Sequence, residues 1–463
     1  MAPSGAASPT GTPGKWGVWL APAVLAAGVA AAYANALLGS FQFDDFNVIV
    51  LNPAVHSWAA WARDMPGLRP LLKATYTLNW TLGPGALGFH AGNLLVHAVN
   101  ALLAYGVLAA FSRRAGGDSH RAGLSAAFFA ALLFALHPVQ TEAVTYVCGR
   151  SGSLMASFYL GSLLAYARGR ETGSGLWCHG LSGGLFVLAL LVKETAVTLP
   201  LALALWEASG PRARRWAWLR GPWLHWLLLL LGAPALLGAL GHGWLLRYGL
   251  EVRSLGDNLL SQVHGVSHLL AQWLWPGTLN LDPWLPALSH WTPVLAGQAV
   301  LLAGLLALGL WNLRRRPWLG FGVLWFFVHL IATNSLVPRL DVANERQLYL
   351  PSLGLCWVLA TGFRLGVARL GLNPRWGPAG LGVLAALLTL RTGVRNRDYR
   401  TEVTLWASSV QAEPRNPRAH NNLGYALELA GEPEPARRAY EAALALDPGY
   451  WRARSNLEAL KSK

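Results

Sequence analysis

The sequence Phe41-Gln42-Phe43-Asp44-Asp45-Phe46-Asn47 follows a long apolar segment, residues 16–38, and opens the first long polar connection of the chain. Two adjacent carboxylates at a membrane boundary cost free energy unless they are solvated, paired or used in chemistry. We therefore interpret Asp44 and Asp45 as the candidate chemical centre. A structural alternative stays open, because a solvated loop or a helix cap also favours aspartate at such a position.

The composition is that of an integral membrane protein. Hydrophobic residues make up 54% of the 463 residues and charged residues only 13%, whereas a soluble domain carries about 25% charged residues. The formal net charge is +15, but Lys and Arg gather in short connections between apolar segments, as the positive-inside rule requires. This distribution argues against nucleic-acid binding. The three cysteines show no metal or redox spacing.

The apolar segments predict an all-α, polytopic domain over residues 15–395, preceded by a disordered segment, residues 1–14. About eleven spans are expected. They cover residues 16–38, 90–111, 122–136, 151–167, 181–192, 196–206, 223–240, 293–310, 318–336, 348–365 and 381–390. The connection 39–88 is rich in Trp, which favours helices lying on the membrane surface. Residues 255–275 are only moderately apolar, so we expect an interfacial or re-entrant helix there.

Basic connections alternate with acidic or neutral ones along the chain. If the N-terminus is cytoplasmic, the positive-inside rule places Asp44-Asp45, residues 137–150, Lys193-Glu194 and residues 339–346 on one shared, non-cytoplasmic face. We expect the chemistry at this face. The sequence contains no phosphate-cradling Gly-rich loop, nucleophile elbow or zinc motif, which argues against nucleotide-driven chemistry.

Several polar residues on the predicted face are candidates for the site, each with a bland alternative. Lys193 and Glu194 interrupt an apolar run, where charges are expensive and indicate function, although a mutual ion pair at a short turn also accounts for them. Arg346 lies at the mouth of a span and suits bidentate phosphate binding, although it also suits snorkelling. Further phosphate candidates are Arg150 and Arg69.

The residues after 395 predict a separate, soluble helical module. Trp406 aligns with Tyr440, and Leu423 with Leu457, at a period of 34 residues, which is the period of tetratricopeptide repeats. The array amounts to about one full repeat with partial repeats on either side. Because such repeats bury their faces only against neighbours, we expect residues 396–463 to pack on the membrane domain or on a partner.

Taken together, these stretches resemble the transmembrane and TPR-containing O-mannosyltransferases. The resemblance rests on Phe43-Asp44-Asp45, Asn52-Pro53, Arg69-Pro70-Leu71, Phe89-His90, Asn93-Leu94-Leu95-Val96-His97, His137-Pro138-Val139-Gln140-Thr141-Glu142, Gly149-Arg150, Lys193-Glu194-Thr195 and Glu345-Arg346-Gln347-Leu348-Tyr349. Order, spacing and the trailing repeats agree over nearly the whole chain. Two departures stand out: Gln140 replaces the family's second histidine, and the repeat array is short. Both indicate a bacterial-type relative.

The resemblance implies a GT-C fold and an inverting transfer of a sugar, mannose in the family, from a polyprenyl-phosphate carrier to a hydroxyl acceptor such as protein Ser or Thr. It assigns catalysis to Asp44 and Asp45, with Asp44 as base. It assigns the donor phosphate to Lys193-Glu194 and Glu345-Arg346, with His137 and Glu142 in support. In a bacterial relative, site and repeats would be periplasmic at the inner membrane.

Two alternatives remain open at the level of the sequence. The aspartate pair would hold a divalent cation, Mg²⁺ or Mn²⁺, if the transfer is metal-dependent, and would act without one if it is not. The chain would instead be a non-enzymatic membrane assembly protein if the repeats alone carry its function.

Overall fold

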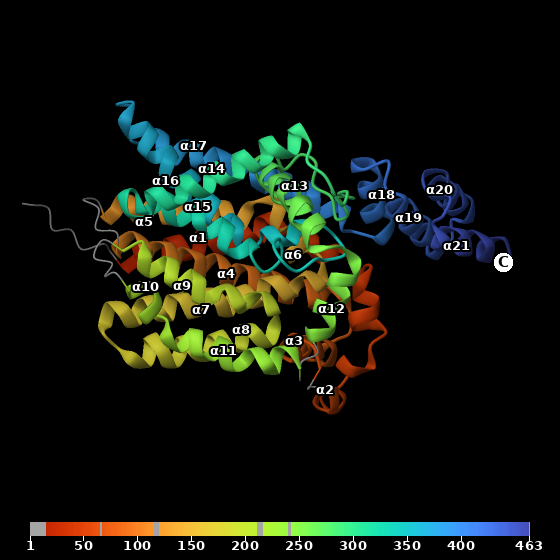
Figure 1. The fold of residues 1–463 in the computed structure, drawn as a ribbon, viewed down its shortest axis with the longest axis horizontal. Helices are drawn as coiled ribbons and strands as arrows, with labels where there is room; N and C mark the ends of the chain where they lie inside the picture. Colours follow the sequence, from red (N-terminus) through yellow and green to blue (C-terminus); the bar gives the residue numbers. More distant parts are fainter. Residues whose placement is uncertain (1–14, 65–66, 115–119, 211–215, 239–241, 463) are drawn as a thin grey trace, which may run out of the picture.

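The computed structural model describes residues 15–462 apart from 65–66, 115–119, 211–215 and 239–241. The predicted disordered segment, residues 1–14, lies outside these residues, as do parts of two basic connections. The described residues form helices and no strand. Most helices lie side by side along the long axis of the molecule, and α18–α21 project from one end (Figure 1).

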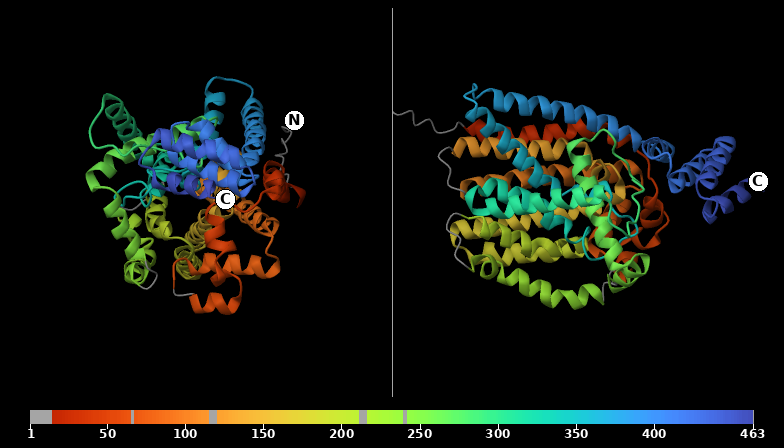
Figure 2. Two further views of the ribbon diagram at one scale, coloured as in Figure 1. Left: turned by 90° about the vertical axis from the view of Figure 1, so that its right-hand side faces the viewer. Right: turned by 45° about the horizontal axis from the view of Figure 1, so that its top comes forward.

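Every predicted span contains a helix. These helices are α1 (Lys15–Tyr33), α4 (Ala86–Arg114), α5 (His120–Leu136), α7 (Arg150–Thr172), α8 (Ser182–Val192), α9 (Leu199–Ala208), α11 (Trp223–Leu237), α14 (Pro293–Arg315), α15 (Pro317–Leu330), α16 (Pro351–Arg369) and α17 (Trp376–Asp398). Helix α13 (Leu255–Leu274) occupies the segment expected to be interfacial or re-entrant. Figure 2 shows the long helices as one bundle from two further sides.

The count of eleven spans is not confirmed. Among the described residues, five helices are long and apolar enough to cross a membrane, or six if the pair Gly123–Leu136 and Pro138–Val144, bent by 53°, counts as one span. A span needs about 20 apolar residues. Helices α8 and α9 have only 11 and 10 residues, because the polar Lys193-Glu194 break divides one apolar run between them.

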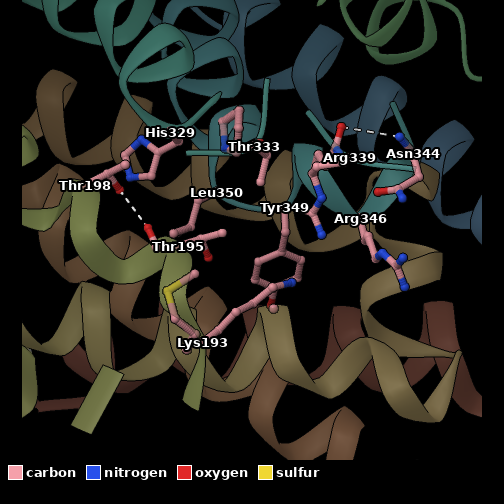
Figure 3. A pocket seen from close by; sticks show the side chains of 14 residues that line it. Lys193, Thr195, Thr198, His329, Thr333, Arg339, Asn344, Arg346, Tyr349 and Leu350 are labelled. Carbon is pink, nitrogen blue, oxygen red and sulfur yellow. Dashed lines mark hydrogen bonds between the residues drawn. The ribbon is translucent and has the colours of Figure 1, made fainter. Parts of the chain in front are cut away.

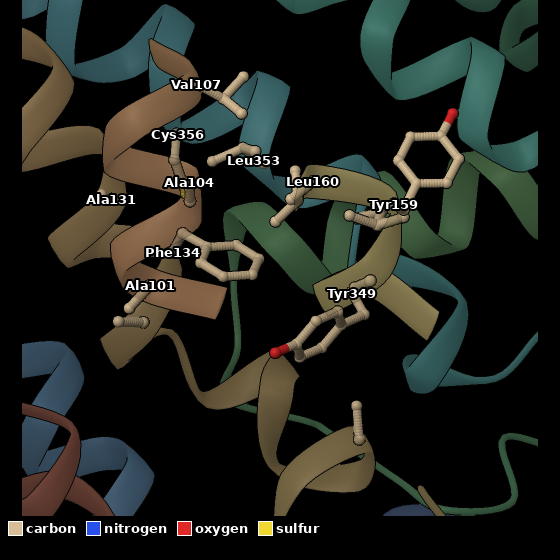
Figure 4. Close-up of a cluster of buried hydrophobic side chains, with 14 of the residues drawn as sticks. Ala101, Ala104, Val107, Ala131, Phe134, Tyr159, Leu160, Tyr349, Leu353 and Cys356 are labelled. Carbon is tan, nitrogen blue, oxygen red and sulfur yellow. The ribbon is translucent and has the colours of Figure 1, made fainter. Parts of the chain in front are cut away.

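Small residues set the spacing of the bundle. A Cβ atom on Gly354 of α16 would lie 2.3 Å from the backbone oxygen of Gly322 on α15, so the two helices touch through their backbones, as small residues permit in membrane bundles. Ala101 and Ala104 of α4 likewise leave room for Phe134 of α5 in the buried cluster of Figure 4.

The first and last helices of the bundle lie against each other. Asn396 on α17 donates through Nδ2 to the Ala32 backbone oxygen and to Asn35 Oδ1, both at 2.9 Å. Asn35 Nδ2 in turn donates to the Gly393 backbone oxygen at 2.7 Å. Satisfied amides are the cheapest way to place polar groups between helices, so these bonds fix the register of α1 on α17.

Short helices and loops gather at the end of the bundle that carries the C-terminal module (Figure 1). They include α2 (Trp58–Asp64), α3 (Pro70–Leu82), α6 (Thr141–Val144) and α12 (His242–Val252). The module consists of α18 (Glu402–Ala412), α19 (Pro417–Leu429), α20 (Pro433–Leu446) and α21 (Trp451–Lys461). A Cβ atom on Gly424 would lie 2.6 Å from the Tyr440 ring, which explains the glycine at this α19–α20 contact.

Candidate functional site

Asp45 is the buried member of the aspartate pair. Its Oδ2 accepts a hydrogen bond from the Gln42 amide at 3.0 Å, and its Oδ1 accepts one from the Cys148 amide at 2.8 Å. Burial raises the pKa of this carboxyl from 3.8 to about 7, against the lowering effect of these hydrogen bonds. Because both oxygens are occupied, Asp45 ties the first loop to the Val147–Gly149 turn.

Asp44 is the less buried member of the pair. It is half-buried, and its backbone amide donates to the Tyr146 hydroxyl at 3.0 Å. Among the described residues, its carboxylate makes no hydrogen bond or ion pair. The preceding residue, Phe43, has a left-handed backbone with φ of 46°, which is uncommon for a bulky side chain and is often associated with functional sites. Asp44 is therefore the carboxylate that is available to a ligand.

Glu142 and Arg346 are brought together from distant parts of the chain. Glu142 is buried in α6, and its Oε2 accepts from the Arg346 backbone amide at 2.8 Å. The Arg346 Nε lies 3.5 Å from Glu142 Oε1, and the arginine side chain stays 29% exposed. Desolvation opposes the charge on Arg346, but the carboxylates of Glu142, Asp44 and Asp341 raise its pKa above the ordinary value.

A polar pocket lies beside this pair (Figure 3). Three cationic side chains line it, each from a separate segment: Lys193 follows α8, Arg339 lies in the loop after α15, and Arg346 precedes α16. The remaining polar lining comes from Thr195, Thr198, His329, Thr333, Asn344, Gln347 and Tyr349. Three cations around one cavity are chemically suited to an anion such as phosphate.

Lys193 is the most buried of the three cations, at 9% exposure. Its ammonium makes no hydrogen bond or ion pair within the described parts of the chain. Desolvation and then the nearby Arg69 lower the pKa of Lys193 to about 7, while Glu194 opposes the shift. A buried ammonium without a close counter-ion binds an incoming anion more strongly than a solvated one.

Arg69 and Glu194 pair with each other at the edge of this region. The Arg69 guanidinium donates to both Glu194 oxygens at 3.0–3.2 Å, and both side chains are about 30% exposed. The ion pair joins the start of α3 to the break between α8 and α9. Glu194 thus holds Arg69, and Arg69 is not among the residues that line the pocket.

The structure gives Arg150, His137 and Glu345 other partners. Arg150 is buried and donates to Asn93 Oδ1 at 2.6 Å, to Asn79 Oδ1 at 2.6 Å and to the Phe89 backbone oxygen at 2.8 Å. Its guanidinium thereby fastens α3 and α4 to α7. These bonds would have to break before Arg150 could hold a donor phosphate.

His137 and Glu345 also hold the fold together. His137 accepts from the Val139 amide through Nδ1 at 3.2 Å, and its Nε2 lies 3.0 Å from the Trp273 backbone oxygen. Glu345 accepts from the Asn280 amide and lies 3.5 Å from the buried Arg395 guanidinium. Neither side chain lines the pocket.

Arg339 is a pocket residue that the sequence did not single out. It lies in the segment 339–346, which loop charge places on the shared face. That position is the sequence signal that could have identified Arg339 as a site residue. No group of three or more His, Cys, Asp or Glu side chains that could hold a metal ion occurs within the described residues.

The fold and the pocket together define the class of the chain. It is a polytopic helical membrane protein with a cation-lined pocket, and a helical repeat follows its bundle. The family model for the tetratricopeptide repeat matches residues 417–450, which confirms the predicted repeat. No solved structure matches the chain, so the GT-C fold stays a prediction.

The curated relatives of the chain are protein O-mannosyl-transferases of the TMTC type, as the sequence resemblance predicts. "Protein O-mannosyl-transferase Tmtc3" of Drosophila melanogaster is 29% identical, over 81% of this chain and 48% of its own length. The Caenorhabditis elegans relative F38B6.6 is 28% identical over 90% and 61%, and human TMTC4 is 27% identical over 88% and 64%. These relatives are animal proteins, so the comparisons do not bear out a bacterial origin. The chain spans about half to two thirds of their length.

Proposed function

We propose that the chain is an inverting glycosyltransferase that moves a sugar, mannose by relationship, from a lipid-phosphate carrier to a hydroxyl acceptor. The observation that carries the proposal is the pocket lined by Lys193, Arg339 and Arg346 near the unpaired Asp44 carboxylate. The names of the relatives support the sugar and a protein acceptor.

Asp44 is the proposed general base. As the acceptor oxygen attacks the anomeric carbon, its proton passes to the Asp44 carboxylate, and the bond from that carbon to the phosphate oxygen breaks. One displacement at the anomeric carbon inverts its configuration. Asp45 holds Asp44 in place through the Gln42 and Cys148 amides and does not touch the reacting atoms.

Lys193, Arg339 and Arg346 are the proposed phosphate site. The leaving phosphate takes the bonding electron pair and gains negative charge as the bond breaks, so fixed cations stabilise the transition state more than the ground state. Glu142 fixes the backbone and Nε of Arg346, which leaves its remaining N–H groups for the phosphate. We expect a polyprenyl chain on that phosphate to enter from the bilayer.

The substitution Asp44→Asn tests the base directly. It removes the proton acceptor while keeping the shape and the Tyr146 contact to the backbone, so we expect transfer to fall by at least about 100-fold, the scale of general-base catalysis. The assay follows radiolabelled mannose from dolichyl or polyprenyl phosphate mannose into a Ser/Thr peptide. Wild-type turnover by the Asn variant would overturn the assignment.

Asp64→Asn is the matched control, because Asp64 lies in the same long connection and pairs with Lys73 at the surface. Exposed pairs contribute little, so this variant should retain full transfer. EDTA treatment followed by Mg²⁺ or Mn²⁺ shows whether the reaction needs a metal. If Asp44→Asn is silent and the chain still assembles a membrane complex, the scaffold alternative is favoured instead.

A further inference from the structure

The start of the loop that carries Asp44, residues 40–43, is bound to the C-terminal part of the chain. Ser40 donates through its amide to the Arg400 backbone oxygen at 3.1 Å, and Gln42 Nε2 donates to the Tyr399 backbone oxygen. Residues 40–43 therefore lie on the segment that joins α17 to α18. The contacts link positions about 360 residues apart in sequence.

Two side chains of α18 hold the residue directly before Asp44. The Phe43 ring meets the Trp406 ring edge to face, with centroids 5.2 Å apart. The Phe43 amide donates to Glu402 Oε1 at 3.3 Å. An edge-to-face aromatic pair contributes about 0.5–1.5 kcal/mol beyond burial, which helps to offset the cost of roughly 1–3 kcal/mol for a left-handed, non-glycine backbone. Trp406 and Glu402 thus help to fix the backbone conformation of the residue next to Asp44.

Helix α19 contacts the loop that carries the pocket residue Arg339, through Asp341. Arg418 donates to Asp282 Oδ2 at 2.7 Å and to Asp341 Oδ1 at 2.7 Å. Asp341 is two residues from the pocket cation Arg339, and its charge also acts on Arg346. By pairing with Asp341, Arg418 keeps this carboxylate from competing with a phosphate for Arg339 and Arg346.

We propose that α18 and α19 form a clamp that aligns the base-bearing loop with the phosphate-binding loop, with Trp406 and Arg418 as positioning residues. This inference rests on the proposed function and extends it, because it gives the C-terminal helices a role in the reaction itself. The clamp has two arms that act on different steps: Trp406 governs the placement of Asp44, and Arg418 governs the charge of the phosphate site.

Steady-state kinetics distinguish the roles of Trp406 and Arg418, because the two substitutions change kcat and donor KM differently. Trp406→Ala frees the Phe43 backbone, so kcat should fall about 10- to 100-fold, the scale of a misplacement near 1 Å, with donor KM nearly unchanged. Arg418→Ala releases Asp341 toward Arg339, so donor KM should rise several-fold and kcat should fall with it, because the same cations also stabilise the leaving phosphate. Trp406→Phe and Arg418→Lys should restore much of each loss.

Matched controls come from the distal part of the module. Trp451 is 68% exposed on α21, and Arg437 pairs with Glu434 and Glu441 on its own helix, α20. Trp451→Ala and Arg437→Ala should leave both constants at the wild-type values. The clamp is wrong if Trp406→Ala keeps wild-type kcat, or if the controls lose as much activity as the clamp variants.

Amide hydrogen exchange tests the clamp without any transferase assay. In Trp406→Ala the segment 40–51 should exchange faster in the full-length protein, while α4 and α7 keep their protection. If the wild type transfers no sugar but Trp406→Ala still speeds exchange of residues 40–51, the clamp is upheld and the glycosyltransferase assignment is rejected. Unchanged exchange would reject the clamp even if the wild type is active.

Discussion

Lys193 carries its charge where little water reaches it. Its pKa of about 7, lowered from 10.5 by desolvation and by Arg69, predicts that the ammonium loses its proton as the pH rises through 7. The neutral amine binds phosphate weakly, so kcat/KM for the lipid donor should fall about tenfold per pH unit above 7. The measurement is a pH–rate profile between pH 6 and 9.

Lys193→Arg separates this titration from others in the same range. A guanidinium stays charged throughout, so the arginine variant should lose the alkaline limb even if its absolute rate is lower. Lys73→Arg serves as the control, because Lys73 pairs with Asp64 away from the pocket. An alkaline limb that persists in Lys193→Arg contradicts the prediction.

Asp45 makes stability depend on pH in the opposite sense to an aspartate whose pKa is lowered by an ion pair. Its folded-state pKa of about 7 lies above the unfolded value of 3.8, so between these values the folded chain binds the extra proton. The free energy of unfolding should therefore decrease as the pH rises from 4 to 7, by about 1.4 kcal/mol for each unit of the pKa difference at this residue. Asp45→Asn, measured by thermal unfolding in detergent, should flatten that slope.

Single residues show what the sequence can and cannot predict about the site. Loop charge alone predicts that Lys193 and Arg346 lie on one face of the membrane, and in the structure both side chains line one pocket. It also selected Arg150 and His137, because a local pattern does not reveal the partner of a side chain. Asn93 and Asn79 accept hydrogen bonds from Arg150 and lie on other helices. Only the three-dimensional packing shows that Arg150 has these partners.

At the scale of the element, the turn between α5 and α7 positions Glu142 against Arg346. A Cβ atom on Gly149 would lie 2.1 Å from the Glu142 backbone oxygen and 2.9 Å from the Ala143 Cα. Gly149→Ala should therefore push α6 away from Arg346 and destabilise the protein by roughly 1–3 kcal/mol, the usual cost of overpacking. Thermal unfolding and donor KM report the two consequences.

Gly175→Ala is the control for this substitution. Gly175 has helical backbone angles and no atom within 4 Å of an added Cβ, so its melting temperature should stay the same or rise slightly. If Gly149→Ala also leaves stability and donor KM unchanged, the turn is not the support of Arg346.

The sequence predicts helices well where apolar runs are long. It predicts the ends of those helices less well. Hydrophobicity located all eleven helices, because burial in a bilayer needs a continuous apolar stretch. It could not decide how many of them cross, because α8 and α9 are short and α5 meets α6 at a bend of 53°. The polar residues of the site lie at these breaks. Such residues interrupt the apolar pattern from which spans are predicted, as functional residues often do.

At the scale of the whole molecule, the positive-inside rule predicts which end faces the cytoplasm. Reporter cysteines in a background without Cys148, Cys178 and Cys356 test this. A thiol reagent that does not cross membranes should label Trp451→Cys on the C-terminal module in sealed vesicles whose non-cytoplasmic face is outward. Arg168→Cys, on α7 near the opposite end, should react only after permeabilisation. The reverse pattern would place the pocket on the cytoplasmic face.

The bonds between Asn35 and Asn396 join positions 361 residues apart, and this separation has a consequence during synthesis. Helix α1 enters the membrane first and must wait for α17, which the ribosome makes last among the bundle helices. Only then can residues 40–43 settle on residues 399–406. A prematurely terminated chain thus lacks the contacts that hold the loop before Asp44 in place.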